Sequence, residues 1–383
     1  MVLIRGNRDL RADFFRGLAL WWIFADHIPG DVLADYSLRN FAFCDATEIF
    51  VLLAGYGAGL AYGRAMDRNG YLHTAADVVR RAWTLYIAHI FLFVVFTAQV
   101  AYSAAALDRA SYLEESNLNV LADAPYRALL EALKLHFQPS LLNILPLYIV
   151  LLLIFVPALA LLRQPYLLLS LSGIAYLLVR HFDINLPSWT GGGWFFDPFA
   201  WQFLFMIGVV LAYRPPLMPR IRWPLDLAAI VVLAAGVFVM VVLTPHPVVG
   251  LYLPPGLLRF LLSEDKTTLH PFRLAAILAL AWGVIRLVPM GAGWLRSRLA
   301  APFVLAGQNS LPVFCAGIFF GFLCRLALEN DDGALMQIAV NGFGALAMLS
   351  VAAIAAWYRA KGRAPRPPGA TPSAPTTIEG NPA

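Results

Sequence analysis

Ten apolar stretches recur along this chain of 383 residues, and each is close to the ~20 residues that a helix needs to cross a bilayer. Backbone groups in lipid must be hydrogen-bonded within their own segment, which favours helices over strands. Only 13% of the residues are charged, against about 25% in a soluble domain. We therefore predict an all-α, polytopic integral membrane protein with about ten transmembrane helices. The expected spans are 13–29, 44–62, 79–103, 141–162, 165–181, 198–213, 224–243, 271–289, 301–325 and 335–358.

The chain is predicted to form one membrane domain with short ends. Residues 13–358 form the ten-helix domain, and residues 1–12 form a cytoplasmic N-terminal segment. Residues 359–383 are rich in Pro, Ala and Thr and are expected to form a disordered cytoplasmic tail. The sequence has no evident internal repeat or second soluble domain.

The distribution of charge sets the expected orientation. If the N-terminus is cytoplasmic, most of the 28 Lys and Arg residues lie on the cytoplasmic side and most acidic residues on the other. Both termini are therefore expected in the cytoplasm. This sorting accounts for the net charge of +5, so no nucleic-acid partner is expected. The three cysteines, Cys44, Cys315 and Cys324, lack the spacing of metal ligands, and no metal site is expected.

The first span carries ionisable residues that are costly in a bilayer and are usually functional there. Arg16 and His27 are eleven residues apart, so they share one face of a helix about 16 Å apart along its axis. Asp13 and Asp26 flank them. The alternative is that Arg16 is a lipid-interface anchor and His27 an interfacial residue.

The second span carries Asp45 and Glu48, which share a helix face near the depth of His27. A carboxylate beside an imidazole fixes its tautomer and raises its basicity. The alternative is that both carboxylates only cap the helix. The spaced glycines Gly55, Gly57 and Gly59 indicate close helix packing rather than phosphate binding.

Further polar residues lie where contact with lipid would be costly, and together they predict a polar cavity within the bundle. They are Arg80, Arg81, Tyr86, His89, Asn143, Tyr148, Trp201, Gln202, Lys266, Gln308, Asn309 and Ser310. Taken singly, each is also explained as a hydrogen-bonding residue inside the bundle.

Two predicted outer loops add to this pattern. The loop 104–140 contains an amphipathic stretch, Tyr126 to His136, which is expected to lie on the membrane surface or to cover the bundle. The loop 182–197 holds Trp189 and Trp194 around three glycines. Such a loop suits a sugar platform, although tryptophan is also enriched at membrane interfaces.

Several of these segments together resemble a known family. Arg16 and His27 preceded by Asp13, with a second span reading Glu48-Ile-Phe-Val-Leu-Leu-Ala-Gly55, resemble the first two spans of the membrane acyltransferase-3 superfamily. Three further segments resemble the narrower OpgC-type proteins, which succinylate periplasmic glucans. These segments are Asn143-Ile-Leu-Pro-Leu-Tyr148, Phe199-Ala-Trp201-Gln202 and Gly307-Gln308-Asn309-Ser310.

The resemblance implies a ten-helix bundle in the bacterial inner membrane that takes an acyl group from a cytoplasmic coenzyme A thioester and delivers it to a sugar hydroxyl outside. His27 matches the family histidine and Arg16 the family arginine. Some relatives carry a fused periplasmic hydrolase-like domain, which is missing here, so this chain is expected to finish the transfer itself.

We expect coenzyme A phosphates to bind Arg16 with Arg80 or Arg81, because arginine binds phosphate through two parallel hydrogen bonds. His27, oriented by Glu48 or Asp45, acts as general base or forms an acyl-imidazole. Asn143, Gln202 or Ser310 stabilises the oxyanion, and Lys266 or Arg273 binds a succinyl carboxylate.

Tyr148 and Trp201 complete the expected substrate site. No permanently bound cofactor is expected. The expected partners are acyl-CoA, a periplasmic glucan and membrane lipid, and the oligomeric state stays open. The alternative function is a glycan or lipid transporter or flippase without acyl chemistry.

Overall fold

The computed structural model describes residues 9–214, 222–246, 250, 252–263 and 265–361. The predicted segment 1–12 up to residue 8 and the predicted tail from residue 362 lie outside the described residues. Within the described part, the chain is all-α, and the only β-pairing is an isolated bridge between Pro187 and Gly193. The prediction of an all-α membrane protein is confirmed.

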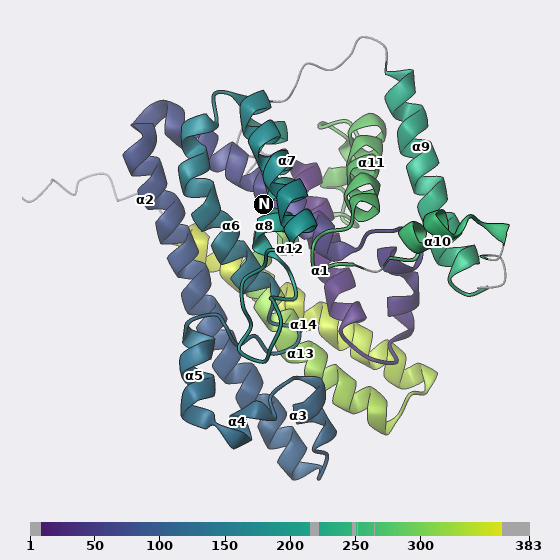
Figure 1. Ribbon diagram of the computed structural model, residues 1–383. Coiled ribbons are helices and arrows are strands. Elements are labelled where there is room, and N and C mark those ends of the chain that lie inside the picture. Colours follow the sequence, from purple (N-terminus) through teal and green to yellow (C-terminus); the bar gives the residue numbers. More distant parts are fainter. Residues whose placement is uncertain (1–8, 215–221, 247–249, 251, 264, 362–383) are drawn as a thin grey trace, which may run out of the picture.

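The elements follow one another along the chain in a bundle with α1, α8 and α12 near its centre (Figure 1). The α-helices are α1 Leu10–Asp26, α2 Ala46–Ala106, α3 Ser111–Glu115, α4 Val120–Asp123, α5 Pro125–Leu133, α6 Ile144–Ala158, α7 Pro165–Phe182, α8 Pro198–Tyr213, α9 Trp223–Val237, α10 Pro255–Leu261, α11 Pro271–Leu287, α12 Ala301–Gln308, α13 Ser310–Asn330 and α14 Ala334–Lys361. Short helical turns are η1 Val32–Tyr36, η2 Leu38–Asn40, η3 Leu159–Leu161, η4 Phe238–Leu243 and η6 Gly293–Arg296.

Six helical segments of the described chain are long and apolar enough to cross a membrane by themselves. They are α2, α6 with η3, α7, α9 with η4, α13 and α14. Three more predicted spans fall on α1, α8 and α11, which are 16 or 17 residues long. Every expected span therefore coincides with helix, and the chain is a polytopic membrane protein.

The predicted second and third spans belong to one element, α2, which runs for 61 residues. The two halves meet at Gly70, whose φ of 75° is a conformation that other residues rarely adopt. Figure 1 shows the resulting bend in α2 at the upper left. The sequence between the two apolar runs contains no proline, so helix continues on both sides of this one glycine.

The predicted ninth span is broken at Asn309 into α12 and α13. Pro312 has no N–H, so it cannot donate to the carbonyl of Gln308 four residues earlier. The guanidinium of Arg359, on α14, supplies this hydrogen bond at 3.0 Å and also donates to Oδ1 of Asn309 at 2.5 Å. The last turn of α14, which extends beyond the predicted boundary at 358, thus stabilises the break.

Glycines allow two pairs of helices to touch backbone to backbone. A Cβ on Gly307 of α12 would lie 1.8 Å from the carbonyl oxygen of Asp13 on α1, and one on Gly17 would lie 1.9 Å from that of Phe303. A Cβ on Gly55 of α2 would lie 2.0 Å from the carbonyl oxygen of Phe205 on α8. The expectation that the glycines of the second span serve helix packing is confirmed at Gly55.

We predict that Gly307→Ala destabilises the bundle, because the added methyl group has no room between α12 and α1. Overpacking of this kind costs about 1–3 kcal/mol or more. The matched control is Gly283→Ala on α11, where a Cβ meets nothing within 4 Å. Thermal unfolding in detergent should show a lower midpoint for Gly307→Ala and an unchanged or higher midpoint for Gly283→Ala. Equal midpoints for the two variants would contradict the packing argument.

Candidate functional site

A cavity of about 980 Å³ lies where the end of α1 meets the start of α6 and two loops. We call it the His27 cavity. His27, Asn143 and Lys266, all predicted site residues, line it together with Trp194 and Phe314. The structure therefore brings three of the predicted residues to one polar space.

His27 is placed by the end of α1. It follows the last helical residue, Asp26, and its backbone N–H still donates to the carbonyl oxygens of Ile23 and Phe24. The Nδ1 atom of its ring is buried and has no hydrogen-bond partner among the described residues. The imidazole thus borders the cavity without a protein group that fixes its tautomer.

Asp45 and Glu48 form the start of α2. The Asp45 side chain accepts from the N–H of Thr47 at 2.8 Å, and the Glu48 side chain accepts from the N–H of Asp45 at 2.8 Å. This reciprocal arrangement is a capping box, in which two otherwise unpaired N–H groups are satisfied. Both carboxylates therefore cap the helix, but capping is not their only role.

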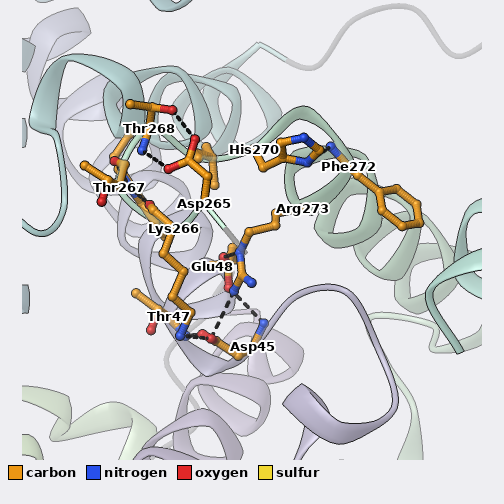
Figure 2. A network of polar contacts seen from close by, with 12 residues as sticks. Asp45, Thr47, Glu48, Asp265, Lys266, Thr267, Thr268, His270, Phe272 and Arg273 are labelled. Atoms are coloured by element: carbon orange, nitrogen blue, oxygen red, sulfur yellow. Dashed lines mark hydrogen bonds and ion pairs between the residues drawn. The ribbon is translucent and has the colours of Figure 1, made fainter. Parts of the chain in front are cut away.

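The same two carboxylates bind two cations from distant parts of the chain (Figure 2). Arg273 donates through Nε to Glu48 at 2.7 Å and through Nη2 to Asp45 at 3.0 Å. Lys266 forms an ion pair with Asp45. Glu48 is 0% exposed, so its charge requires a partner inside the bundle. We call Asp45, Glu48, Lys266 and Arg273 the four-charge cluster.

The cluster alters the role expected for its acids. Neither carboxylate bonds to His27 in this structure, because both are held by cations and by the helix start. The expected orientation of His27 by Glu48 or Asp45 is therefore not present in the geometry. Asp45 instead holds Lys266, whose side chain is 34% exposed and lines the cavity, while Glu48 holds Arg273.

The loop that carries Lys266 is held by hydrogen bonds from the core of the bundle. Trp201 is fully buried, and its indole N–H donates to the carbonyl oxygens of Lys266 and Thr267 at 3.0 and 3.1 Å. Burial acts to raise the pKa of Asp265, but hydrogen bonds from Thr268 and pairing with Arg180 lower it below its usual value. Trp201, expected to bind substrate, instead positions the loop.

Three other predicted substrate residues are not among those that line the His27 cavity. Gln202 is buried and exchanges hydrogen bonds with Ser172 of α7. The ring of Tyr148 lies 6.3 Å from that of Phe205, and Ser310 is the first residue of α13. These three side chains are placed among helices rather than on the cavity surface.

The predicted donor-binding residues lie in separate places. Arg16 donates to the carbonyl oxygen of Leu53 at 2.5 Å, beside Gly57, where α1 passes the first half of α2. Arg80 is exposed and pairs with Asp77 on the second half of α2. Arg80 and Arg81 lie close enough to Tyr62, in the first half of α2, for their charges to act on its hydroxyl. The cavity lined by His27 does not include Arg16.

Sequence reasoning underestimated two residues. Arg273 was named only as a possible carboxylate ligand, although a lone arginine in the apolar run of α11 calls for buried anionic partners. Trp194 was expected in a loop that suits a sugar platform or a membrane interface, and its place in the wall of this cavity had no local signal. Among the described residues, no group of three His, Cys, Asp or Glu side chains is placed to hold a metal ion.

We predict that Arg273→Met destabilises the protein by about 3–5 kcal/mol, because it leaves two buried carboxylates with a single lysine. The matched control is Arg286→Met on the same helix, since Arg286 forms a surface pair with Asp226 worth about 0–1 kcal/mol. Chemical or thermal unfolding in detergent measures both. A loss for Arg273→Met no larger than for Arg286→Met would show that the cluster does not stabilise the fold.

Comparison with known protein families gives a match that covers nearly the whole chain. The family model described as OpgC protein matches residues 8–360, which include α1 with Arg16 and His27, the four-charge cluster and most of α14. No curated protein and no solved structure matches this chain significantly. A family match of this extent shows that the chain belongs to the OpgC protein family.

Proposed function

We propose that this protein is an O-acyltransferase of the bacterial inner membrane, with both termini in the cytoplasm. It moves an acyl group, specifically succinyl, from a cytoplasmic coenzyme A thioester to hydroxyl groups of a periplasmic glucan. The observation that carries the proposal is the His27 cavity, in which an imidazole without a protein partner borders the same polar space as Lys266 and Asn143.

His27 is suited to proton transfer at this position. The neutral imidazole takes the proton of a glucan hydroxyl while the hydroxyl oxygen attacks the thioester carbonyl. The new ester forms as the carbon–sulfur bond breaks, and the imidazolium returns its proton to the departing thiolate. An acyl-imidazole intermediate on His27 is a second route to the same product.

Asn143 is the candidate for stabilising the oxyanion of this reaction. It lines the cavity, and its side chain makes no hydrogen bond to another described residue. One such donor contributes about 2.7–4 kcal/mol to lowering a barrier. Gln202 and Ser310, the other two expected donors, are less well placed because they do not line the cavity.

Arg16 is proposed to bind the phosphates of the donor. It lies on the same helix as His27, about 16 Å away along the axis, at the end with Asp9 and Arg11. Arg359 lies close to this end as well, through its hydrogen bonds at the break between α12 and α13. These cations suit a polyanionic ligand at the cytoplasmic face. For Arg80 and Arg81, binding of the donor phosphates is proposed from their charge alone.

Lys266 is proposed to recognise the free carboxylate of a succinyl group. It is the cation of the four-charge cluster that reaches the cavity, whereas Arg273 is buried and bonded to both acids. A carboxylate that enters the cavity can share Lys266 with Asp45. Binding of this carboxylate distinguishes a succinyl donor from an acetyl donor, because an acetyl group carries no carboxylate.

A glycan or lipid transporter is the second candidate, and the break at Asn309 favours it because discontinuous helices are typical of transporters. Purified protein in liposomes, supplied with glucan and acyl-CoA labelled in the acyl group, separates the two. Label covalently attached to glucan supports the transferase. Glucan that crosses the bilayer without label supports the transporter.

We predict that His27→Ala lowers the rate of acyl transfer by about 10²–10⁴-fold, which is the usual contribution of a general base. The matched control is His181→Ala, because His181 is an exposed histidine at the end of α7. Transfer of labelled acyl groups to glucan measures both, and the unfolding midpoint confirms that each variant is folded. A His27→Ala enzyme with the wild-type rate would exclude His27 as base and as nucleophile.

We predict that Lys266→Met selectively impairs the succinyl donor. Loss of a charge-assisted hydrogen bond should lower kcat/KM for succinyl-CoA about ten- to hundredfold, while the value for acetyl-CoA changes much less. Lys134→Met is the control, since Lys134 lies on the same side of the protein and pairs with Glu131 at the surface. If Lys266→Met lowers kcat/KM for both donors by one common factor, Lys266 does not read the carboxylate.

A further inference from the structure

One wall of the His27 cavity is the loop between α7 and α8, which is tightly built. The N–H of Trp194 donates to the carbonyl oxygen of Leu186 at 2.9 Å, and the Asn185 amide donates to the carbonyl oxygen of Trp194 at 2.9 Å. A Cβ on Gly193 would lie 2.4 Å from this amide. Asn185 and Gly193 thus fix the backbone from which the Trp194 side chain projects.

The two tryptophans of this loop have different surroundings. Trp189 is held by other parts of the protein. Its backbone N–H donates to the carbonyl oxygen of His136, and its ring packs edge-on against Phe137 with the ring centroids 5.5 Å apart. Trp194 is 4% exposed and lines the cavity. Its indole N–H is buried without an acceptor among the described residues.

A buried indole N–H without an acceptor is unusual, because buried tryptophans normally find a hydrogen-bond partner. The buried Oδ2 of Asp197, three residues further along, is also unpaired and does not accept from this N–H. Asn185 uses its amide on the backbone of Trp194, and its Oδ1 accepts from the N–H of Leu186 at 2.7 Å. Because Trp194 lines the cavity, an oxygen of a ligand bound there is a group that can accept from it.

The chemistry of the cavity lining indicates which ligand supplies that oxygen. Among the polar side chains, amides and hydroxyls such as Asn117, Gln138 and Ser140 outnumber the charged Asp183 and Lys266. The Gln138 amide donates to the carbonyl oxygen of Leu135, so its Oε1 is left to accept. The cation Lys266 is paired with Asp45 and is assigned above to the acyl donor. Such a lining suits an uncharged ligand with many hydroxyl groups better than a nucleotide or an anionic lipid.

We propose that Trp194 is an acceptor-binding residue whose indole N–H donates to an oxygen of the glucan. Together with the other cavity-lining residues of its loop, Asn185, Ser188, Thr190 and Gly191 to Gly193, it forms the sugar subsite beside His27. This rests on the proposed acyl transfer for its biological meaning, because it places the reacting hydroxyl next to the imidazole. It adds a residue and a subsite to that proposal, and the binding of sugar can be measured without acyl transfer.

The first test compares Trp194→Phe with Trp189→Phe, two identical substitutions in one loop. Trp194→Phe keeps an aromatic ring and removes the N–H, so the KM for glucan should rise roughly 3- to 10-fold. Its kcat and its KM for acyl-CoA should stay within about twofold of wild type. Trp189→Phe should leave all three unchanged, because Trp189 is not part of the cavity lining. A fall in kcat with an unchanged KM for glucan would overturn the assignment.

The second test needs no turnover and no variant enzyme for its main readout. Protein labelled with ¹⁵N at its tryptophan indoles is titrated with a neutral glucose oligosaccharide in detergent, and the Trp194 signal is assigned from Trp194→Phe or, if that variant fails to fold, from Trp194→Tyr. The indole signal of Trp194 should move on addition of sugar, while that of Trp189 should not.

The outcomes separate the subsite from the proposed function. If the Trp194 signal moves but no acyl group reaches the sugar, the subsite stands and the transferase proposal fails. If acyl transfer occurs and the Trp194 signal stays unchanged at saturating sugar, the subsite is wrong and the transferase proposal stands.

Discussion

The pairing of Arg273 with Asp45 and Glu48 is the interaction on which the site depends. It joins the start of α2 to the start of α11, two segments separated by more than two hundred residues. Charges buried in a low-dielectric interior are tolerated only when they are paired and hydrogen-bonded. The four groups of the cluster sum to zero formal charge, so the bundle can enclose them. Without Arg273, the two acids would face each other with Lys266 alone.

In the cluster and around it, chemically similar residues have different roles. Asp45 and Glu48 cap α2 and hold cations, so they are not available to His27. Trp201 braces the loop at 265–270 from within the core, and Trp194 borders the open space on the other side. Arg273 is enclosed, and Lys266 reaches the cavity. Position in the fold, rather than residue type, decides which member of each pair is free to meet a ligand.

The sequence predicted those features that depend on local pattern. Runs of apolar residues gave the helices, because a helix in lipid must bury its backbone groups whatever surrounds it. The spacing of Asp45 and Glu48 gave the capping box, and Gly55 gave a close helix contact. Features that depend on distant partners were missed. Nothing near Arg359 indicates that it completes the hydrogen bonding of a break at Asn309, and nothing near Trp194 indicates the cavity that it borders. The continuity of α2 across Gly70 was also missed, since a glycine among polar residues is equally typical of a loop.

The contact of α1 with α12 has a consequence for any molecule that links the two ends of α1. Because the carbonyl oxygens of Asp13 and Phe303 fill the space above Gly307 and Gly17, α1 cannot slide or turn against α12 without the backbones separating. Arg16 lies on α1 and His27 directly follows its last residue, so the axial rise of this one rigid helix keeps the two residues at a constant spacing. A molecule gripped at the guanidinium presents its reactive carbon to the imidazole only if the chain between its anchoring group and that carbon has the matching reach. With the donor bound at Arg16 as proposed, this fixed spacing makes the helix select the donor by length, a criterion that requires no contact with the intervening atoms.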